Sequence, residues 1–277
     1  MCLSGSSRTI VEWDRKQELA LPKIIVLTGA GLSADSGIDT YRGKGGVYRG
    51  IPTETVLSVK TFREDPDLVH GLCDDRRVEL AAAAPNPAHL MIGELARTYG
   101  DDLVHITQNI DDLVERAGYQ GSMHVHGYLT RMRSVGNSKV LRDIGYKRYW
   151  SGADGDAPAD GYRFRCPKTG SHFRPDVVLY SSMLHQELAP MYPLAYRAMR
   201  SLDPEDLLVV IGTEGSVLPV DMWARKATCF KVLNNLHDAA DISPGNFNVY
   251  LRETAATAAE KILQIAEDHM GRFKAAP

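Results

Sequence analysis

Short hydrophobic runs recur along the chain, and each of them ends in small or polar residues. Continuous runs of Val, Ile and Leu of this length predict strands that are buried on both faces, as in a parallel sheet covered by helices. The runs occupy residues 23–27, 103–106, 176–180, 207–211, 231–233 and 248–251.

Helical patterns lie between these runs and after the last one. Residues 86–99 and 111–117 are each followed by a glycine, which suits the position where a left-handed residue closes a helix. Residues 254–270 carry an apolar stripe at helical spacing. The alternation of strands and helices predicts a doubly wound α/β sheet, whose ligands bind beyond the carboxyl ends of the strands.

Two stretches interrupt this alternation. Residues 43–84 form a charged, mixed segment that is longer than an ordinary βα loop, so we expect helices that lie over the ligand. Residues 134–171 include SGADGDAPADG, whose composition predicts an exposed, mobile loop. Together the two stretches predict a small second lobe.

Composition narrows the classes of function. The 277 residues include 32 Lys and Arg against 35 Asp and Glu, a net charge of −3 that argues against nucleic acid as a partner. The apolar runs fall far short of the roughly 18 residues of a membrane span, and the first residues do not resemble a secretory leader. Four widely spaced cysteines fit a reducing compartment. We therefore expect a cytoplasmic protein without membrane partners.

A glycine-rich turn follows the first predicted strand. GAGLSA at residues 29–34 matches GxGxxG/A, in which glycines let the backbone approach a pyrophosphate at a helix N-terminus. A tight strand-to-helix turn without a ligand is the alternative. The acidic residue expected about 20 positions further on is not evident. Glu54 has that spacing, but no predicted strand precedes it.

Polar side chains follow later strands. TQNID at residues 107–111 places two amides and a carboxylate after a strand, although Asp111 could equally serve as a helix N-cap. HVHG at residues 124–127 offers His124 and His126, each of which could be a base or a structural histidine. Ser33 and Ser36 lie outside any GxSxG motif, which argues against a hydrolase triad.

The order of these motifs resembles the sirtuin family. GAGLSADSGIDTYRG, TQNIDDLVERAG, HVHG, RPDVVLY and GTEGSVLP follow one another in the family's order, over about residues 23–265. The family pattern GAGxSxxSGIPxFRG is met at Gly29, Ala30, Gly31, Ser33, Ser36, Gly37, Ile38, Arg42 and Gly43, with Tyr41 in the aromatic place.

The resemblance implies a Rossmann-like lobe, a small lobe and NAD bound between them. It places the large lobe at about 20–42, 85–127 and 173–270, and the small lobe at about 43–84 and 128–172. It further implies an NAD-dependent protein lysine deacylase that releases nicotinamide and O-acyl-ADP-ribose, with an acyl-lysine protein or peptide as partner. The implied catalytic residues are His126, as general base, Asn109 and Asp111. The implied cofactor-binding residues are Gly29, Ala30, Gly31, Ser33, Ser36, Ile38, Arg42, Gln108, Asn109, Asp111, Gly212, Thr213 and Asn234.

The chain departs from the family at its metal site. Sirtuins often carry two CxxC pairs in the small lobe, and the corresponding positions here are Ser134, Asn137, Cys166 and Thr169. One cysteine out of four ligands cannot hold a structural zinc of the usual type, so we expect no metal. This lobe must then be stabilised in another way.

Further departures concern the ligands. The implied substrate-binding residues are Val177, Val178 and Tyr180, where VVLYSS replaces the family's VVxFGE. Glu214 replaces the usual Ser after GT and could weaken NAD by like-charge repulsion, unless it points away. A sirtuin subgroup binds acidic acyl groups with a Tyr and an Arg, whose places here hold Cys73 and Arg76. Arg76 could pair with a carboxylate or simply be solvated.

Two other functions use the same pocket. An NAD glycohydrolase or mono-ADP-ribosyltransferase would use water or a protein side chain as acceptor. A non-catalytic NAD-sensing module would bind without turnover, but such a module would not need Asn109, Asp111 and His126 together.

Overall fold

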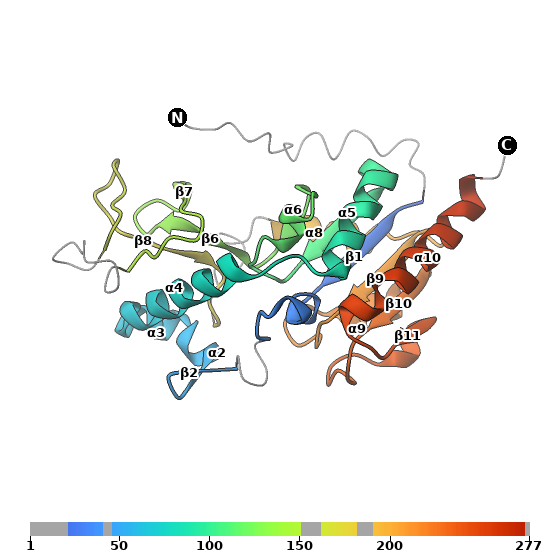
Figure 1. Ribbon diagram of the computed structural model, residues 1–277, viewed down its shortest axis with the longest axis horizontal. Coiled ribbons are helices and arrows are strands. Elements are labelled where there is room, and N and C mark those ends of the chain that lie inside the picture. The colour runs from blue at the N-terminus through green and yellow to red at the C-terminus, as the bar shows by residue number, and fades with distance from the viewer. Residues whose placement is uncertain (1–21, 41–45, 151–161, 182–190, 275–277) are drawn as a thin grey trace.

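A computed structural model describes residues 22–40, 46–150, 162–181 and 191–274. Its centre is a six-stranded sheet in the order β11-β10-β9-β1-β4-β5, in which every neighbouring pair is parallel (Figure 1). The predicted doubly wound α/β fold is thereby confirmed. The strands are β1 (Ile24–Thr28), β4 (Leu103–Thr107), β5 (Met123–His124), β9 (Leu207–Ile211), β10 (Phe230–Asn234) and β11 (Val249–Leu251).

Helices cover both faces of this sheet. Alternate residues of β1 belong to different cores, with Ile24 and Val26 on one face and Ile25 and Leu27 on the other. The first face packs against α5 (Pro87–Tyr99) and α10 (Ala255–Lys274), and the second against α8 (Met191–Arg200) and α9 (Val220–Lys226). No helix in the described ranges is long and apolar enough to cross a bilayer.

The predicted helix over residues 86–99 is confirmed, including its two ends. The Asn86 side chain accepts hydrogen bonds from the amides of Ala88 and His89, and Gly100 closes the helix at a positive φ of 55°. The helix predicted over residues 111–117 is shorter, because α6 spans only Leu113–Arg116.

One predicted strand belongs to a different sheet. The run at residues 176–180 predicts a strand of the parallel sheet, but β8 (Phe173–Val177) pairs antiparallel with β6 (Gly127–Ser134), which also pairs with β7 (Leu141–Asp143). Asp176 of β8 forms ion pairs with Arg131 and Arg133 of β6. The run looks apolar enough for a central strand, yet β8 is an edge strand and tolerates Pro175 for that reason.

Residues 43–84 were predicted to hold helices, and within the described part they do. A short hairpin of β2 (Val47–Tyr48) and β3 (Ile51–Pro52) leads into α2 (Thr53–Val56), α3 (Val59–Glu64) and α4 (Pro66–Ala82). In Figure 1 these helices gather with β6, β7 and β8 at one side of the six-stranded sheet. The boundaries given above for the two lobes stay a prediction.

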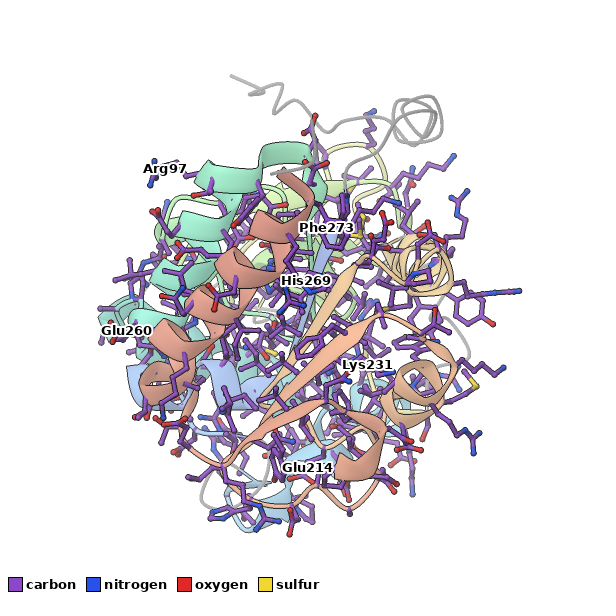
Figure 2. The ribbon with its side chains drawn as sticks, turned by 90° about the vertical axis from the view of Figure 1, so that its right-hand side faces the viewer. Arg97, Glu214, Lys231, Glu260, His269 and Phe273 are labelled. Atoms are coloured by element: carbon purple, nitrogen blue, oxygen red, sulfur yellow. The ribbon has the colours of Figure 1, made fainter. Side chains whose placement is uncertain are left out.

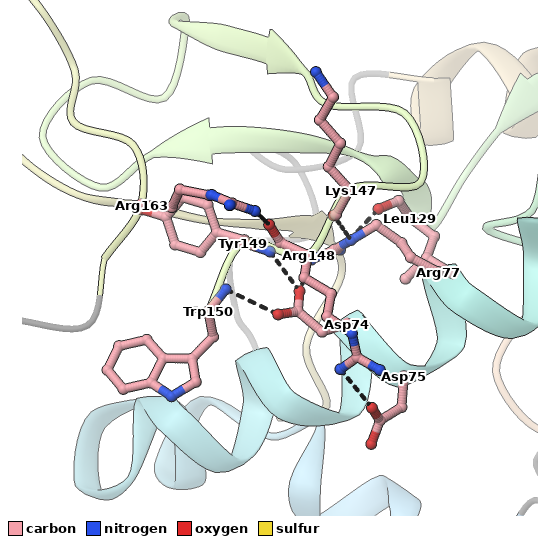
Figure 3. A network of polar contacts seen from close by, with 9 residues as sticks. All are labelled: Asp74, Asp75, Arg77, Leu129, Lys147, Arg148, Tyr149, Trp150 and Arg163. Carbon is pink, nitrogen blue, oxygen red and sulfur yellow. Dashed lines mark hydrogen bonds and ion pairs between the residues drawn. The ribbon is translucent and has the colours of Figure 1, made fainter. Parts of the chain in front are cut away.

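A buried ion pair joins α4 to the rest of this region (Figure 3). Arg77 is fully buried, pairs with Asp74 and donates to the carbonyls of Leu129 and Lys147, each at 3.0 Å. Asp74 also accepts from the amides of Tyr149, at 2.9 Å, and Trp150, at 2.8 Å. Burial raises the pKa of the Asp74 carboxyl and Arg77 opposes that rise. The network ties a helix, β6 and the segment 147–150 together.

The turn that corresponds to the family's second cysteine pair is closed by backbone hydrogen bonds. The amide of Gly170 donates to the carbonyl of Cys166, and the amide of Cys166 donates to the carbonyl of Ser171, both at 2.8 Å. Cys166 is buried in a cluster with Tyr149 and Phe173. No group of three or more His, Cys, Asp or Glu suited to a metal lies within the described residues. Backbone hydrogen bonds and apolar packing therefore hold this turn.

Candidate active site

A cavity of about 690 Å³ opens at the carboxyl ends of the parallel strands. Its size lies in the range of small-molecule and cofactor sites, and its position agrees with the rule for open α/β sheets. Most residues implied by the family resemblance line it. These are Gly29, Ala30, Gly31, Gln108, Asn109, His126, Val177, Val178, Tyr180, Gly212, Thr213 and Asn234.

Two glycines bring the loops after β1 and β9 into backbone contact. A Cβ on Gly31 would lie 2.6 Å from Gly212 Cα, and the Gly31 amide donates to the Gly212 carbonyl at 2.9 Å. Gly212 also has a φ of 62°, which L side chains rarely adopt. The segment after Gly29 forms two 3₁₀ turns, Ala30–Leu32 and Ala34–Ser36, where the motif typically begins a helix.

Ser33 is the centre of a buried hydrogen-bond network behind the cavity. Its Oγ lies 3.2 Å from His89 Nε2, accepts from Asn109 Nδ2 at 3.1 Å and donates to Asp111 Oδ2 at 2.9 Å. The Asn86 amide donates to His89 Nδ1 at 3.1 Å, so the proton of His89 lies on Nε2 and is donated to Ser33. Burial lowers the pKa of His89 to about 4, which keeps the ring neutral near pH 7.

Asp111 takes part in both arrangements that its sequence position allows. Its Oδ1 accepts from the Leu113 amide at 3.1 Å, as a capping residue would, while its Oδ2 accepts from Ser33. Burial raises the pKa of the Asp111 carboxyl, and these two hydrogen bonds oppose the rise. Asp111 does not itself line the cavity; through Ser33 it is connected to Asn109, which does.

We expect Ser33→Ala to weaken NAD binding and to lower turnover, because Asn109 and Asp111 each lose a buried partner. The free energy of unfolding should fall by about 1–3 kcal/mol. Ser122→Ala is a matched control, since Ser122 is also buried and its Oγ lies 2.9 Å from His105 Nδ1, away from the cavity. Calorimetric titration with NAD and chemical unfolding would compare the variants. Equal NAD affinity in both would contradict a positioning role for Ser33.

The two histidines of HVHG have different surroundings. His126 lines the cavity, and its Nδ1 donates to the Gln108 carbonyl at 2.9 Å. This hydrogen bond places the proton on Nδ1 and leaves Nε2 as the basic nitrogen. His124 is buried, with Nδ1 bonded to the Asn109 carbonyl and Nε2 to Glu115, both at 2.9 Å. His126 therefore has the geometry of a base, and His124 that of a structural residue.

An unsatisfied acceptor marks the far end of the cavity. Asn234 Nδ2 donates to the carbonyls of Leu251, at 3.0 Å, and Glu253, at 2.9 Å, whereas Oδ1 is buried without a partner among the described residues. Such an atom is costly unless a ligand supplies a donor. Nearby, Thr213 accepts from Gln108 Nε2 at 2.8 Å. This end fits a ligand rich in hydroxyl groups, as NAD is.

The segment after β8 borders the cavity on another side. Val178 donates to the His126 carbonyl at 2.9 Å, and Tyr180 exchanges backbone hydrogen bonds with Leu57 and Val59. Ser181, in the place of the family's glycine, has a φ of 60°, the left-handed region that favours glycine. The backbone conformation suited to that glycine is therefore kept although the residue differs.

Some implied residues are not brought to the cavity. Ser36 bonds to Asn86 and Ile38 packs in the core around α4. Arg76 forms an ion pair with Glu79 on the same helix and does not line the cavity, while Cys73 is buried. Arg42 lies outside the described residues.

Other lining residues were not expected from the motifs. Leu57 comes from the segment between β3 and α3, where no chemical pattern distinguishes it. Asn235 follows β10 directly and Thr254 lies shortly after β11, so their place after strands could have indicated them. Asp35 and Glu253 also line the cavity.

Comparisons with known proteins agree with this site. A model of the Sir2 family matches residues 29–219. An NAD-dependent protein deacylase of Campylobacter jejuni strain RM1221 is 33% identical over 251 residues, which cover 90% of this chain and 98% of the relative. One of Yersinia pseudotuberculosis is 37% identical over 205 residues, covering 73% and 67%.

Solved structures give the same result. A Sir2 homologue in complex with NAD has a TM-score of 0.71 at 29% identity and covers 90% of each chain. A mutant Sir2 homologue in complex with 2′-O-acetyl ADP ribose has a TM-score of 0.73 at 27% identity, covering 90% of this chain and 93% of that one. The chain therefore belongs to the Sir2 family, the sirtuins, as its motifs predict.

Proposed function

We propose that this protein is an NAD-dependent protein deacylase that removes acyl groups from lysine side chains. The observation that carries the proposal is His126, which faces the cavity with its tautomer fixed by the Gln108 carbonyl. The relatives of Campylobacter and Yersinia, which carry this activity in their names, support it. NAD is the cofactor, and the unsatisfied Asn234 Oδ1 fits its hydroxyl groups.

The chemistry assigns a role to each group. Bound NAD supplies the ADP-ribosyl group that takes up the acyl group as nicotinamide leaves. His126 Nε2 accepts a proton from a ribose hydroxyl as general base. Ser33 fixes the amide of Asn109 at the cavity wall, so that it can orient the reacting groups. The neutral His89 and the buried Asp111 hold Ser33 in turn.

The acyl-lysine peptide binds as an extended segment beside residues 177–181. The backbone N–H and C=O of Tyr180 are already paired with Leu57 and Val59. Adjacent residues of an extended chain direct these groups to opposite edges. A substrate strand would therefore pair with Leu179, a form of strand addition that reads the substrate mainly through its backbone.

Mass spectrometry of the products tests the proposal. Incubation with NAD and an acetyl-lysine peptide should yield the free lysine peptide together with O-acetyl-ADP-ribose. Free ADP-ribose with an intact acyl peptide would indicate an NAD glycohydrolase. ADP-ribose attached to protein would indicate a transferase. Bound but unchanged NAD would indicate a sensor.

A cytoplasmic location is part of the same proposal. Cys73, Cys166 and Cys229 are free and buried, which suits a reducing compartment. A fusion to a fluorescent protein would test it by microscopy.

A further inference from the structure

Residues 124–129 bind four successive carbonyls at the end of β4 and in the loop after it. Backbone amides supply the outer two hydrogen bonds, at 3.0 and 2.8 Å. The inner two come from imidazole rings, because His126 donates to the Gln108 carbonyl and His124 to the Asn109 carbonyl, both at 2.9 Å. Gln108 and Asn109 line the cavity. The two histidines therefore fix a backbone from which cavity side chains project.

His124 faces an oxygen at each of its ring nitrogens. Its Nδ1 lies 2.9 Å from the Asn109 carbonyl, which can only accept, so Nδ1 carries a proton. Its Nε2 lies 2.9 Å from Oε1 of Glu115, a residue of α6. Two acceptors at this distance would repel, so a proton lies between these two atoms, and an imidazole is ordinarily a stronger base than a carboxylate. Both nitrogens of His124 are therefore protonated, and the ring is a cation paired with ionised Glu115.

The surroundings of this pair favour the two charges. The Tyr128 ring lies against His124, with ring centroids 4.0 Å apart and planes tilted by 30°, and the face of an aromatic ring attracts a cation. The second carboxylate oxygen of Glu115, Oε2, is buried and has no hydrogen-bond partner among the described residues. A buried charged oxygen of this kind depends on an opposite charge nearby. The imidazolium of His124 supplies that charge.

A charged donor holds the Asn109 backbone more firmly than a neutral donor would. The His124 side chain is only 2% exposed, so water does not compete for its hydrogen bonds. Hydrogen bonds from an ionised donor are roughly twice as strong as those between neutral groups. The side chain of Asn109 in turn donates to Ser33, and the residue before it supplies the carbonyl that sets the tautomer of His126. Loss of the charge would therefore loosen both groups.

We propose that His124 is a positioning residue, a buried imidazolium that Glu115 keeps charged and that holds the backbone of Asn109 in the geometry the reaction needs. His124 is not among the residues that line the cavity, so it acts through Asn109 and does not touch the ligand. This role rests on the proposed function, because the reaction concerned is the peptide-dependent release of nicotinamide.

Nitrogen-15 NMR of the full chain near pH 7 tests the charge. The ring signals of His124 are identified by their absence from the spectrum of His124→Leu. We expect both ring nitrogens to be protonated in the unaltered protein. Glu115→Gln keeps the size of the side chain but removes its charge, so one ring nitrogen of His124 should lose its proton in this variant. An unprotonated ring nitrogen in the unaltered protein would overturn the proposal.

Steady-state kinetics of nicotinamide release with an acetyl-lysine peptide test the positioning. His124→Leu removes the donor and should lower kcat about 10- to 100-fold, the worth of a hydrogen bond to a charged group. Glu115→Gln leaves a neutral donor and should lower kcat about fivefold, the difference between a charged and a neutral hydrogen bond. The KM for NAD should change much less in both variants, because the other loops that line the cavity are unchanged.

His269→Leu is the matched control. His269 is also buried and its Nε2 donates to the Glu205 carbonyl at 2.8 Å, but it lies on α10 beside Phe273, outside the cavity (Figure 2). Both histidine variants should lower the midpoint of chemical unfolding, whereas only His124→Leu should lower kcat.

The outcomes separate this role from the proposed function. If His124→Leu and Glu115→Gln fold and keep the kcat of the unaltered protein, His124 has no positioning role. If His124→Leu does not fold, the kcat of Glu115→Gln decides. Absence of peptide-dependent release from the unaltered protein would instead refute the proposed function.

Discussion

His126→Ala should lower peptide-dependent nicotinamide release by about 10²- to 10⁴-fold, the usual contribution of a general base. The variant should still bind NAD, because the loops that contain Thr213 and Asn234 also line the cavity and are unchanged. Release of nicotinamide measured by chromatography, together with a calorimetric titration of NAD, separates the two effects.

His172→Ala serves as the control for this experiment. His172 lies at an exposed contact with Arg165, outside the cavity, and its loss should leave turnover close to that of the unaltered protein. If His126→Ala kept its turnover, His126 would not be the base. If it lost NAD binding to the same degree as turnover, its role would be in binding.

Arg77→Met should lower the free energy of unfolding by about 3–5 kcal/mol, because it leaves the buried carboxylate of Asp74 without its cation. The next residue along the helix offers a matched control. Arg76 is partly exposed and pairs with the exposed Glu79, so Arg76→Met should lower the free energy of unfolding by no more than about 1 kcal/mol. Chemical unfolding of both variants measures the difference.

The same experiment tests how the region around α4 and β6 is stabilised. If the network of Asp74 and Arg77 replaces a metal there, a chelator should not change the unfolding midpoint of the unaltered protein. Hydrogen exchange should show that Arg77→Met loses protection at β6 and at residues 147–150, which the network joins. A cost equal to that of Arg76→Met would contradict this account.

Local patterns were sufficient for most strands of the parallel sheet. The runs that became β1, β4, β9 and β10 are largely apolar because both faces of the sheet are covered, and this leaves a clear signal. The ends of α5 were equally evident, since Asn86 and Gly100 are residues typical of helix caps. Such features depend on neighbours in sequence.

Features that depend on distant pairing could not be predicted in this way. The run that includes β8 resembles a central strand, and only its antiparallel pairing with the distant β6 shows that it belongs to another sheet. Arg76 and Arg77 are adjacent in sequence, yet the helix leaves the first partly exposed and buries the second completely. Gly212 meets the glycine-rich turn only because β9 lies beside β1.

The motifs predicted which residues form the site, but they did not predict the hydrogen bonds between these residues. The motifs named Ser33, Asn109, Asp111 and His126, without the hydrogen bonds that join the first three. His89 enters the network through the N-terminus of α5, where the Asn86 amide sets its tautomer. His89 acts only through Ser33, so no motif at the site itself could have indicated it.

Nicotinamide release from NAD, measured with and without acyl-lysine peptides, tests the central claim most directly. A series of acetyl-, succinyl- and longer-acyl peptides would also identify the acyl group. We predict that nicotinamide release requires an acyl-lysine peptide. The peptide should lose its acyl group at the same rate as nicotinamide is released. Release at the same rate without any peptide would contradict the assignment as a deacylase.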